Sequence, residues 1–208
     1  LIHCFNSTTM KKLVIFDLDG RVDMILDGGS VEIGIESTII DCTGAMPMIL
    51  RPGFISQEDV KELLGACEID PAILKKPDAD FHPKAPGMKY RHYAPKANLT
   101  IVEGSSAHVT SEMLHLAEAE ELAGRKVGIL CTEESLPIFE GHVHGQVKCI
   151  GLRRDEETIA HNLFRCLREF DEENVDVIYS ESYGDGPLGA AIMNRLVKAA
   201  GYHIRNVD

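Results

Sequence analysis

The stretch Lys-Val-Gly-Ile-Leu-Cys at residues 126–131 opens with a lysine, continues as an apolar run and lies between helical patterns. Runs of this kind are typical of strands that are buried on both faces of a parallel sheet. We expect further strands at residues 99–102, 147–152, 175–179 and 203–206, helices at 109–122, 155–170 and 188–200, and a short helix at 133–139. Because strands and amphipathic helices alternate, residues 98–208 are predicted to form a three-layer α/β domain with a mostly parallel sheet.

Residues 21–65 have a different character and mix short strands with turns. Strands are expected there at 22–26, 36–41 and 48–50, and a helix at 56–64, and another strand is expected before this segment at 11–16. Ser56 is a favourable N-cap, and Asp59 follows three residues later as in a capping box. This part of the chain is therefore predicted to be a second, smaller α/β segment.

Residues 66–97 are a candidate linker, because five prolines make a continuous helix or sheet unfavourable there. The same stretch carries Lys89, Arg91, His92 and Tyr93. One interpretation is a connection that staples two domains together. The other is a strap that closes over an anionic ligand, and composition alone does not decide between them.

Charge and composition narrow the class of partner. The chain has 208 residues, a formal net charge of −12 and a pI near 5.2. Since affinity for phosphate backbones depends on Lys and Arg, non-specific nucleic-acid binding is disfavoured and a small molecule or a protein is the better partner. No apolar run reaches the roughly 18 residues of a membrane helix, and no secretory signal is evident, so we expect no membrane and a cytoplasmic protein.

The cysteines and histidines offer little chemistry by their spacing. The six cysteines form no C-x-x-C pair, so we expect reduced and mostly buried thiols, with no metal site. His142 and His144 form an H-x-H pair that lacks a third ligand, and solvated loop is the better interpretation. Cys131 is expected to be a core thiol, and residues 180–187 are expected to make an interdomain contact.

Ser37, Thr38 and Arg51 are the candidate ligand contacts. Hydroxyls can donate to phosphate oxygens, and the planar fork of an arginine suits phosphate or carboxylate. A hairpin that turns near Gly44 would bring Ser37 and Arg51 together across two strands. The alternative is structural, because Ser and Thr are common at the starts of strands.

Four motifs in order resemble one known family. They are Gly-Arg-Val-Asp-Met-Ile-Leu-Asp-Gly-Gly (20–29), Glu-Ser-Thr-Ile-Ile-Asp (36–41), Leu-Arg-Pro-Gly (50–53) and Pro-Gly-Met-Lys-Tyr-Arg-His-Tyr-Ala-Pro-Lys (86–96). Their order resembles the two-domain form of the threonylcarbamoyl-AMP synthases, whose catalytic domain is of the YrdC type. The resemblance covers residues 20–208, and it implies that residues 98–208 are a Rossmann-like accessory domain.

The resemblance also implies a function and a site. The family condenses L-threonine, bicarbonate and ATP, with magnesium, into threonylcarbamoyl-AMP and pyrophosphate, and this product serves tRNA modification, so tRNA is involved only indirectly. By position, Ser37, Thr38 and Arg51 match the nucleotide pocket. Lys89, Arg91, His92 and Tyr93 match a strap over the ligand.

The first twenty residues depart from that pattern. Asp17 and Asp19 follow an apolar strand, as in the opening motif of haloacid-dehalogenase-type phosphatases, where they would act with magnesium. We therefore expect an atypical segment at 1–20, a truncated remnant of the YrdC-like catalytic domain at 21–65, a linker or strap at 66–97 and the accessory domain at 98–208. A half-sheet would need strand exchange or a homodimer.

Three hypotheses follow for the activity. The first is the synthase or an incomplete form of it, and its catalytic residues remain unknown. The second is a non-catalytic module that binds a nucleotide or regulates a partner. The third is a magnesium-dependent phosphatase that uses Asp17 and Asp19.

Overall fold

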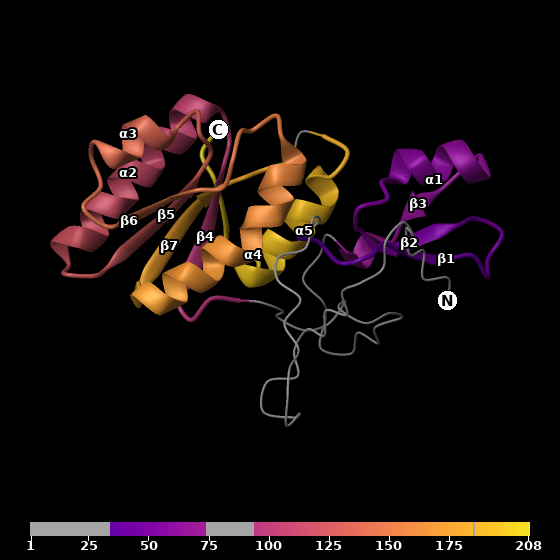
Figure 1. Cartoon of the computed structure of the whole chain (residues 1–208), viewed down its shortest axis with the longest axis horizontal. Coiled ribbons are helices and arrows are strands. Elements are labelled where there is room, and N and C mark those ends of the chain that lie inside the picture. The colour runs from indigo at the N-terminus through magenta and orange to yellow at the C-terminus, as the bar shows by residue number, and fades with distance from the viewer. Residues whose placement is uncertain (1–33, 74–93, 185) are drawn as a thin grey trace, which may run out of the picture.

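The computed structural model describes residues 34–73, 94–184 and 186–208, which form two sheets. Within the described residues no helix is long and apolar enough to cross a membrane. Figure 1 shows the larger α/β unit with the smaller unit beside its helix α5.

The larger unit is a five-stranded sheet with the order β6-β5-β7-β4-β8, and its strand pairs are parallel. The strands are β4 (Asn98–Glu103), β5 (Val127–Cys131), β6 (Gln146–Cys149), β7 (Val177–Glu181) and β8 (Ile204–Asn206). Every residue of β5 and β7 is buried, which agrees with the apolar sequence of β5 and with the apolar first half of β7.

Helices cover both faces of this sheet (Figure 1). Side chains of α2 (Ser106–Leu122) and α3 (Leu136–Glu140) belong to one apolar cluster. Those of α4 (Glu156–Glu173) and α5 (Gly189–Ala199) belong to the other. The expected three-layer α/β architecture with a mostly parallel sheet is confirmed.

Several element boundaries differ from those expected from the sequence. The strand expected at 147–152 ends at Cys149, because Gly151 adopts a positive φ of 132°. The strand expected at 175–179 starts at Val177, because α4 continues to Glu173 and ends at Asn174 in the left-handed conformation. The charged residues at 171–173 therefore form the last turn of α4.

The smaller unit contains three strands, one helix and a short 3₁₀ turn. They are β1 (Ile39–Asp41), β2 (Met48–Arg51), α1 (Gln57–Leu64), β3 (Glu68–Ile69) and the turn Pro71–Ile73. β1 and β2 pair antiparallel, so the predicted hairpin is confirmed, and β2 pairs with β3 in parallel. The core of this unit is formed by Ile49, Val60, Cys67 and Ile73.

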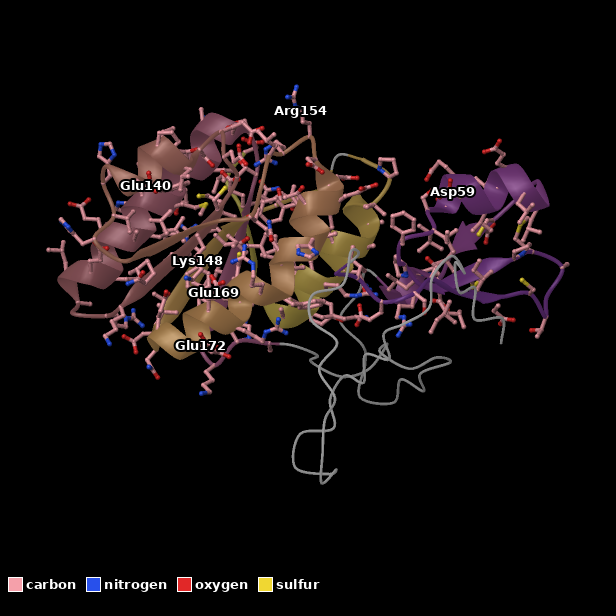
Figure 2. The ribbon with its side chains drawn as sticks, in the orientation of Figure 1. Asp59, Glu140, Lys148, Arg154, Glu169 and Glu172 are labelled. Carbon is pink, nitrogen blue, oxygen red and sulfur yellow. The ribbon has the colours of Figure 1, made fainter. Side chains whose placement is uncertain are left out.

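The capping box predicted for α1 is present. The Ser56 hydroxyl accepts a hydrogen bond from the Asp59 backbone N–H, and the Asp59 carboxylate accepts one from the Ser56 backbone N–H. Gly65 closes the helix with a φ of 80°. The side chain of Asp59 lies at the N-terminal end of α1 in Figure 2.

The segment before β1 packs into the larger unit. Ile35 is a member of the apolar cluster under α4 and α5, and Phe54 packs against the same cluster. A Cβ on Gly34 would come within 2.6 Å of the Ala160 carbonyl oxygen on α4, so the two backbones are in close contact. The two units therefore share one apolar junction.

Two differences concern the ends of the smaller unit. The strand expected at 36–41 starts only at Ile39, because residues 36–38 make their contacts outside the ladder. Glu68 and Ile69 form a strand inside the stretch 66–97, where the prolines argued against regular structure. The expected strands at 11–16 and 22–26, Asp17 and Asp19 lie outside the described residues, so the phosphatase and strand-exchange hypotheses stay predictions.

Candidate functional site

Ser37 and Arg51 meet at the start of the hairpin. The Arg51 Nη2 donates to the Ser37 hydroxyl at 3.1 Å, and its Nε donates to the Ser37 carbonyl oxygen at 3.0 Å. The ladder explains the approach, because Arg51 is the register partner of Ile39, two residues beyond Ser37. The predicted proximity of the hydroxyl and the guanidinium is confirmed, and a half-buried pair of this kind suits an anionic oxygen.

Thr38 is engaged within the protein. Its hydroxyl donates to the Ile55 carbonyl oxygen at 2.8 Å, and the residue is buried. This bond ties the segment before β1 to the segment before α1. A role of Thr38 in binding a ligand stays a prediction, as do those of Ser37 and Arg51.

Gly53 permits the close approach of these two segments. A Cβ at this position would lie 2.3 Å from the Thr38 nitrogen and 2.4 Å from the Glu36 carbonyl oxygen, which are both backbone atoms. No larger residue fits without moving the backbone that carries Ser37. In the Arg-Pro-Gly sequence at 51–53, Arg51 thus supplies a cation, and Gly53 allows the neighbouring segment to come close enough for Arg51 to bind it.

A buried ion pair that the sequence did not reveal lies beside Ser37. The Arg195 Nε on α5 donates to the Glu36 Oε2 at 2.5 Å, and the two side chains are 6% and 23% exposed. Burial raises the pKa of the Glu36 carboxyl, but the charge and the hydrogen bond of Arg195 offset this effect and hold the pKa below its ordinary value. Glu36 is therefore an anion next to the candidate pocket.

Lys198, one turn further along α5, is also buried. Burial lowers the pKa of its ammonium to about 8, and the charges of Arg195 and Arg51 act in the same direction, whereas Glu36 opposes them. α5 thus presents Asn194, Arg195 and Lys198 as buried polar residues among its apolar ones. In the sequence these residues resemble an ordinary solvated helix face. The only signal of their burial is that they lie on one side of the helix.

A cleft of about 290 Å³ lies between the two units, and the residues that follow Arg51 in the sequence line it. Pro52, Gly53 and Ile55 line it from the smaller unit, and Gly184, Gly189 and Met193 line it from the larger one. A neighbouring cleft is lined by Ser56 and Asp59 on one side and by Arg153 and Glu156 on the other. Gly184, Gly186 and Pro187 line these clefts together with residues of the smaller unit. An interdomain contact of the stretch 180–187 stays a prediction.

Glu181 organises the carboxyl edge of the larger sheet, where ligands bind in open α/β folds. Its buried carboxylate accepts hydrogen bonds from the Thr132 N–H at 3.1 Å, the Ser135 hydroxyl at 2.5 Å and the Arg153 Nη2 at 2.9 Å. Several partners already satisfy this carboxylate. The network therefore fixes the loops after β5 and β6 and leaves little capacity for a ligand.

The remaining sequence candidates fall outside this site. Cys131 is a fully buried core thiol, as expected, and burial raises its pKa far above the ordinary value. Among the residues that the structure describes, no group of His, Cys, Asp and Glu could hold a metal ion. Lys89, Arg91, His92 and Tyr93 lie outside the described ranges, and the strap stays a prediction.

Comparison with known proteins gives a consistent result. The family model described as threonylcarbamoyl-AMP synthase, C-terminal domain, matches residues 55–201, and the Sua5_yciO_yrdC model, described as telomere recombination, matches residues 5–53. Threonylcarbamoyl-AMP synthases of Bacillus subtilis and Pyrococcus abyssi are 43% and 39% identical over 94% and 97% of this chain. The Schizosaccharomyces pombe synthase is 38% identical over 93% of it.

The chain belongs to the threonylcarbamoyl-AMP synthase family. It spans about half the length of these relatives: 54% of the B. subtilis, 56% of the P. abyssi and 49% of the S. pombe protein. The expected family is thus confirmed from relatives that match nearly the whole chain.

Solved synthase structures agree with the fold. The crystal structure of P. abyssi Sua5 complexed with L-threonine superposes with a TM-score of 0.80 at 39% identity, over 92% of this chain and 53% of that one. A double alanine variant of the same protein gives a TM-score of 0.79 at 38% identity, over 92% and 52%. The pairing of a small hairpin unit with a Rossmann-like domain is therefore shared with these synthases.

Proposed function

We propose that this chain takes part in the synthesis of threonylcarbamoyl-AMP, an intermediate in tRNA modification, and that it belongs to a cytoplasmic enzyme that uses ATP, L-threonine and bicarbonate. The observation that carries the proposal is the Ser37–Arg51 pair, joined at 3.1 Å where the family resemblance places a nucleotide contact. The L-threonine bound in the P. abyssi relative supports a small-molecule substrate. tRNA itself is involved only indirectly.

The proposed reaction joins the threonine amine to the carbon of bicarbonate and attaches the resulting carbamate to the α-phosphate of ATP. Pyrophosphate leaves from ATP, and one bicarbonate oxygen leaves as water. Charge develops on the departing pyrophosphate, and we propose that Arg51, which donates to the Ser37 hydroxyl, stabilises an anionic oxygen there. From the sequence, Lys89 and Arg91 would add further positive charge.

Among the described residues, no group of three or more His, Cys, Asp and Glu could hold a metal ion. Glu36 is the carboxylate closest in sequence to Ser37, and Arg195 already binds it. Magnesium is commonly held by substrate phosphates with one or two carboxylates. We therefore propose magnesium as the ion that accompanies ATP.

The test is pyrophosphate release by the chain in the presence of ATP, L-threonine and bicarbonate, together with calorimetry of ATP binding. Release that requires all three substrates supports the proposal. Arg51→Met should lower the rate by roughly 100-fold, the effect of losing one preorganised donor. The matched control is Arg125→Met, because Arg125 has a half-exposed side chain and forms an ion pair with Glu120 in the larger unit.

Two other outcomes would overturn the proposed enzyme. ATP binding without turnover would favour the alternative of a non-catalytic nucleotide-binding or regulatory module. Neither binding nor turnover would contradict both. Phosphate release from a phosphate monoester, abolished by Asp17→Asn, would instead favour the phosphatase hypothesis.

A further inference from the structure

Two neighbouring residues of α5 bind the smaller unit at two separate points. The Asn194 Nδ2 donates to the Ile73 carbonyl oxygen at 3.0 Å, and the Arg195 Nε donates to the Glu36 carboxylate at 2.5 Å. Ile73 is a core residue of the smaller unit, and Glu36 directly precedes Ser37. One turn of α5 therefore fixes both the segment before β1 and the turn after β3.

Ser37 lies between anchors that belong to different units. On one side, Ile35 is buried in the core of the larger unit, and Glu36 is bound to α5. On the other side, the Thr38 hydroxyl is bound to the backbone of the smaller unit at Ile55. The position of Ser37 relative to Arg51 therefore depends on how the larger unit holds residues 35 and 36.

Arg195 is itself held rigidly. It is 5% exposed, and its Nη1 donates to the Asn194 Oδ1 at 2.9 Å. Its Nη2 is buried and has no hydrogen-bond partner among the described residues. A buried ion pair is weak evidence for net stability, and an unpartnered buried donor is unfavourable. What the guanidinium adds over an apolar side chain is a fixed direction for the Glu36 carboxylate.

We propose that Arg195 is a positioning residue: by binding Glu36 it fixes the backbone of Ser37, and so holds the Ser37–Arg51 pair in the geometry that receives the nucleotide. The accessory domain then contributes to the pocket without touching the ligand. The identity of the ligand as a nucleotide rests on the proposed function, whereas the positioning of residues 36–38 by Arg195 does not.

The experiment uses the whole chain with Arg195→Met, Glu36→Gln, their double variant and Arg195→Lys. Lys148→Met is the matched control, because Lys148 is 13% exposed and forms ion pairs with Glu169 and Glu173 of α4. Figure 2 shows Lys148 and Glu169 in the larger unit, away from the smaller one. Two quantities are measured: hydrogen exchange of the backbone amides at 34–41, and the dissociation constant for ATP.

Arg195→Met should accelerate exchange at 34–41 by about tenfold or more, relative to the rest of the protein, and weaken ATP binding by roughly 10- to 100-fold. Glu36→Gln, which keeps one acceptor oxygen, should shift both quantities in the same direction by less. The double variant should bind ATP no more weakly than Arg195→Met, because both changes break one interaction. Arg195→Lys should recover part of the loss, and Lys148→Met should change neither quantity.

Unchanged exchange at 34–41 in both single variants would overturn the inference. If Arg195→Met does not fold, unchanged exchange in Glu36→Gln alone would overturn it. An equal effect of Lys148→Met would also overturn it, since Arg195 would then act only through global stability. If the unmodified chain does not bind ATP while exchange responds as expected, the positioning by Arg195 is supported and the proposed function fails.

Discussion

Replacing Lys198 by methionine should stabilise the protein at neutral pH. Lys198 is 8% exposed on α5, and burial, together with the charges of Arg195 and Arg51, lowers the pKa of its ammonium to about 8, although Glu36 opposes the shift. Its ordinary pKa is 10.5. Methionine keeps a flexible unbranched stem of similar length and carries no charge.

The magnitude follows from the two pKa values. Each pH unit between them corresponds to about 1.4 kcal/mol, so the charged ammonium costs about 3 kcal/mol of stability below pH 8. The sign follows from proton binding: between pH 8 and pH 10.5 the unfolded chain holds this proton more tightly than the folded one. The free energy of unfolding contributed by Lys198 therefore rises with pH across that window.

Urea unfolding of both proteins at pH 7, 8, 9 and 10 measures this effect. Lys198→Met should be more stable by up to about 3 kcal/mol at pH 7, and the advantage should decrease towards pH 10. Lys148→Met should show the opposite sign at pH 7, because ion pairs with Glu169 and Glu173 raise the pKa of Lys148 against the effect of burial. A stability difference for Lys198→Met that does not change with pH would refute the argument.

Three further changes test the packing of the described residues by urea or thermal unfolding. Gly53→Ala should cost roughly 2–4 kcal/mol, because its Cβ meets backbone atoms that cannot move independently; a neutral result would show that the two segments separate easily. Ser56→Ala should cost about 1 kcal/mol by removing the cap of α1, and combining it with Asp59→Ala should add little. Glu181→Leu should cost about 2–4 kcal/mol, because it removes the acceptor of the buried Thr132 N–H and of the buried Ser135 hydroxyl; a loss below about 1 kcal/mol would contradict the account of this network.

The larger unit was predictable because its strands carry their own signal. β5 is buried along its whole length and reads as an uninterrupted apolar run, and β7 opens with the apolar residues Val177, Ile178 and Tyr179, so both strands can be recognised whatever their neighbours are. Boundaries were less predictable, because they depend on single residues such as Gly151 and Asn174 in positive-φ conformations. β3 could not be predicted, because Glu68 and Ile69 are too few residues to show a period of two.

The candidate site was predictable only where its parts are close in sequence. Ser37 and Arg51 are 14 residues apart on one hairpin, so the turn near Gly44 was enough to predict that they meet. Glu36 and Arg195 are 159 residues apart, and no local pattern links them. Arg195 was missed because a charged residue on an amphipathic helix is ordinarily assigned to solvent, and its burial follows only from the docking of the smaller unit against α5.

At the junction, the boundary between the two family-model matches does not coincide with the boundary between the two structural units. The two family models meet between residues 53 and 55, whereas β2, which belongs to the first match, pairs with β3, which belongs to the second. The core of the smaller unit likewise combines Ile49 from the first match with Val60 and Cys67 from the second. A cut at residue 54 would remove α1 and β3 from the hairpin and expose Ile49, so neither family segment keeps the described small sheet by itself. The part of the chain that fixes Ser37 is therefore built jointly by both segments, and a helix of the larger unit binds the carboxylate of Glu36 beside it.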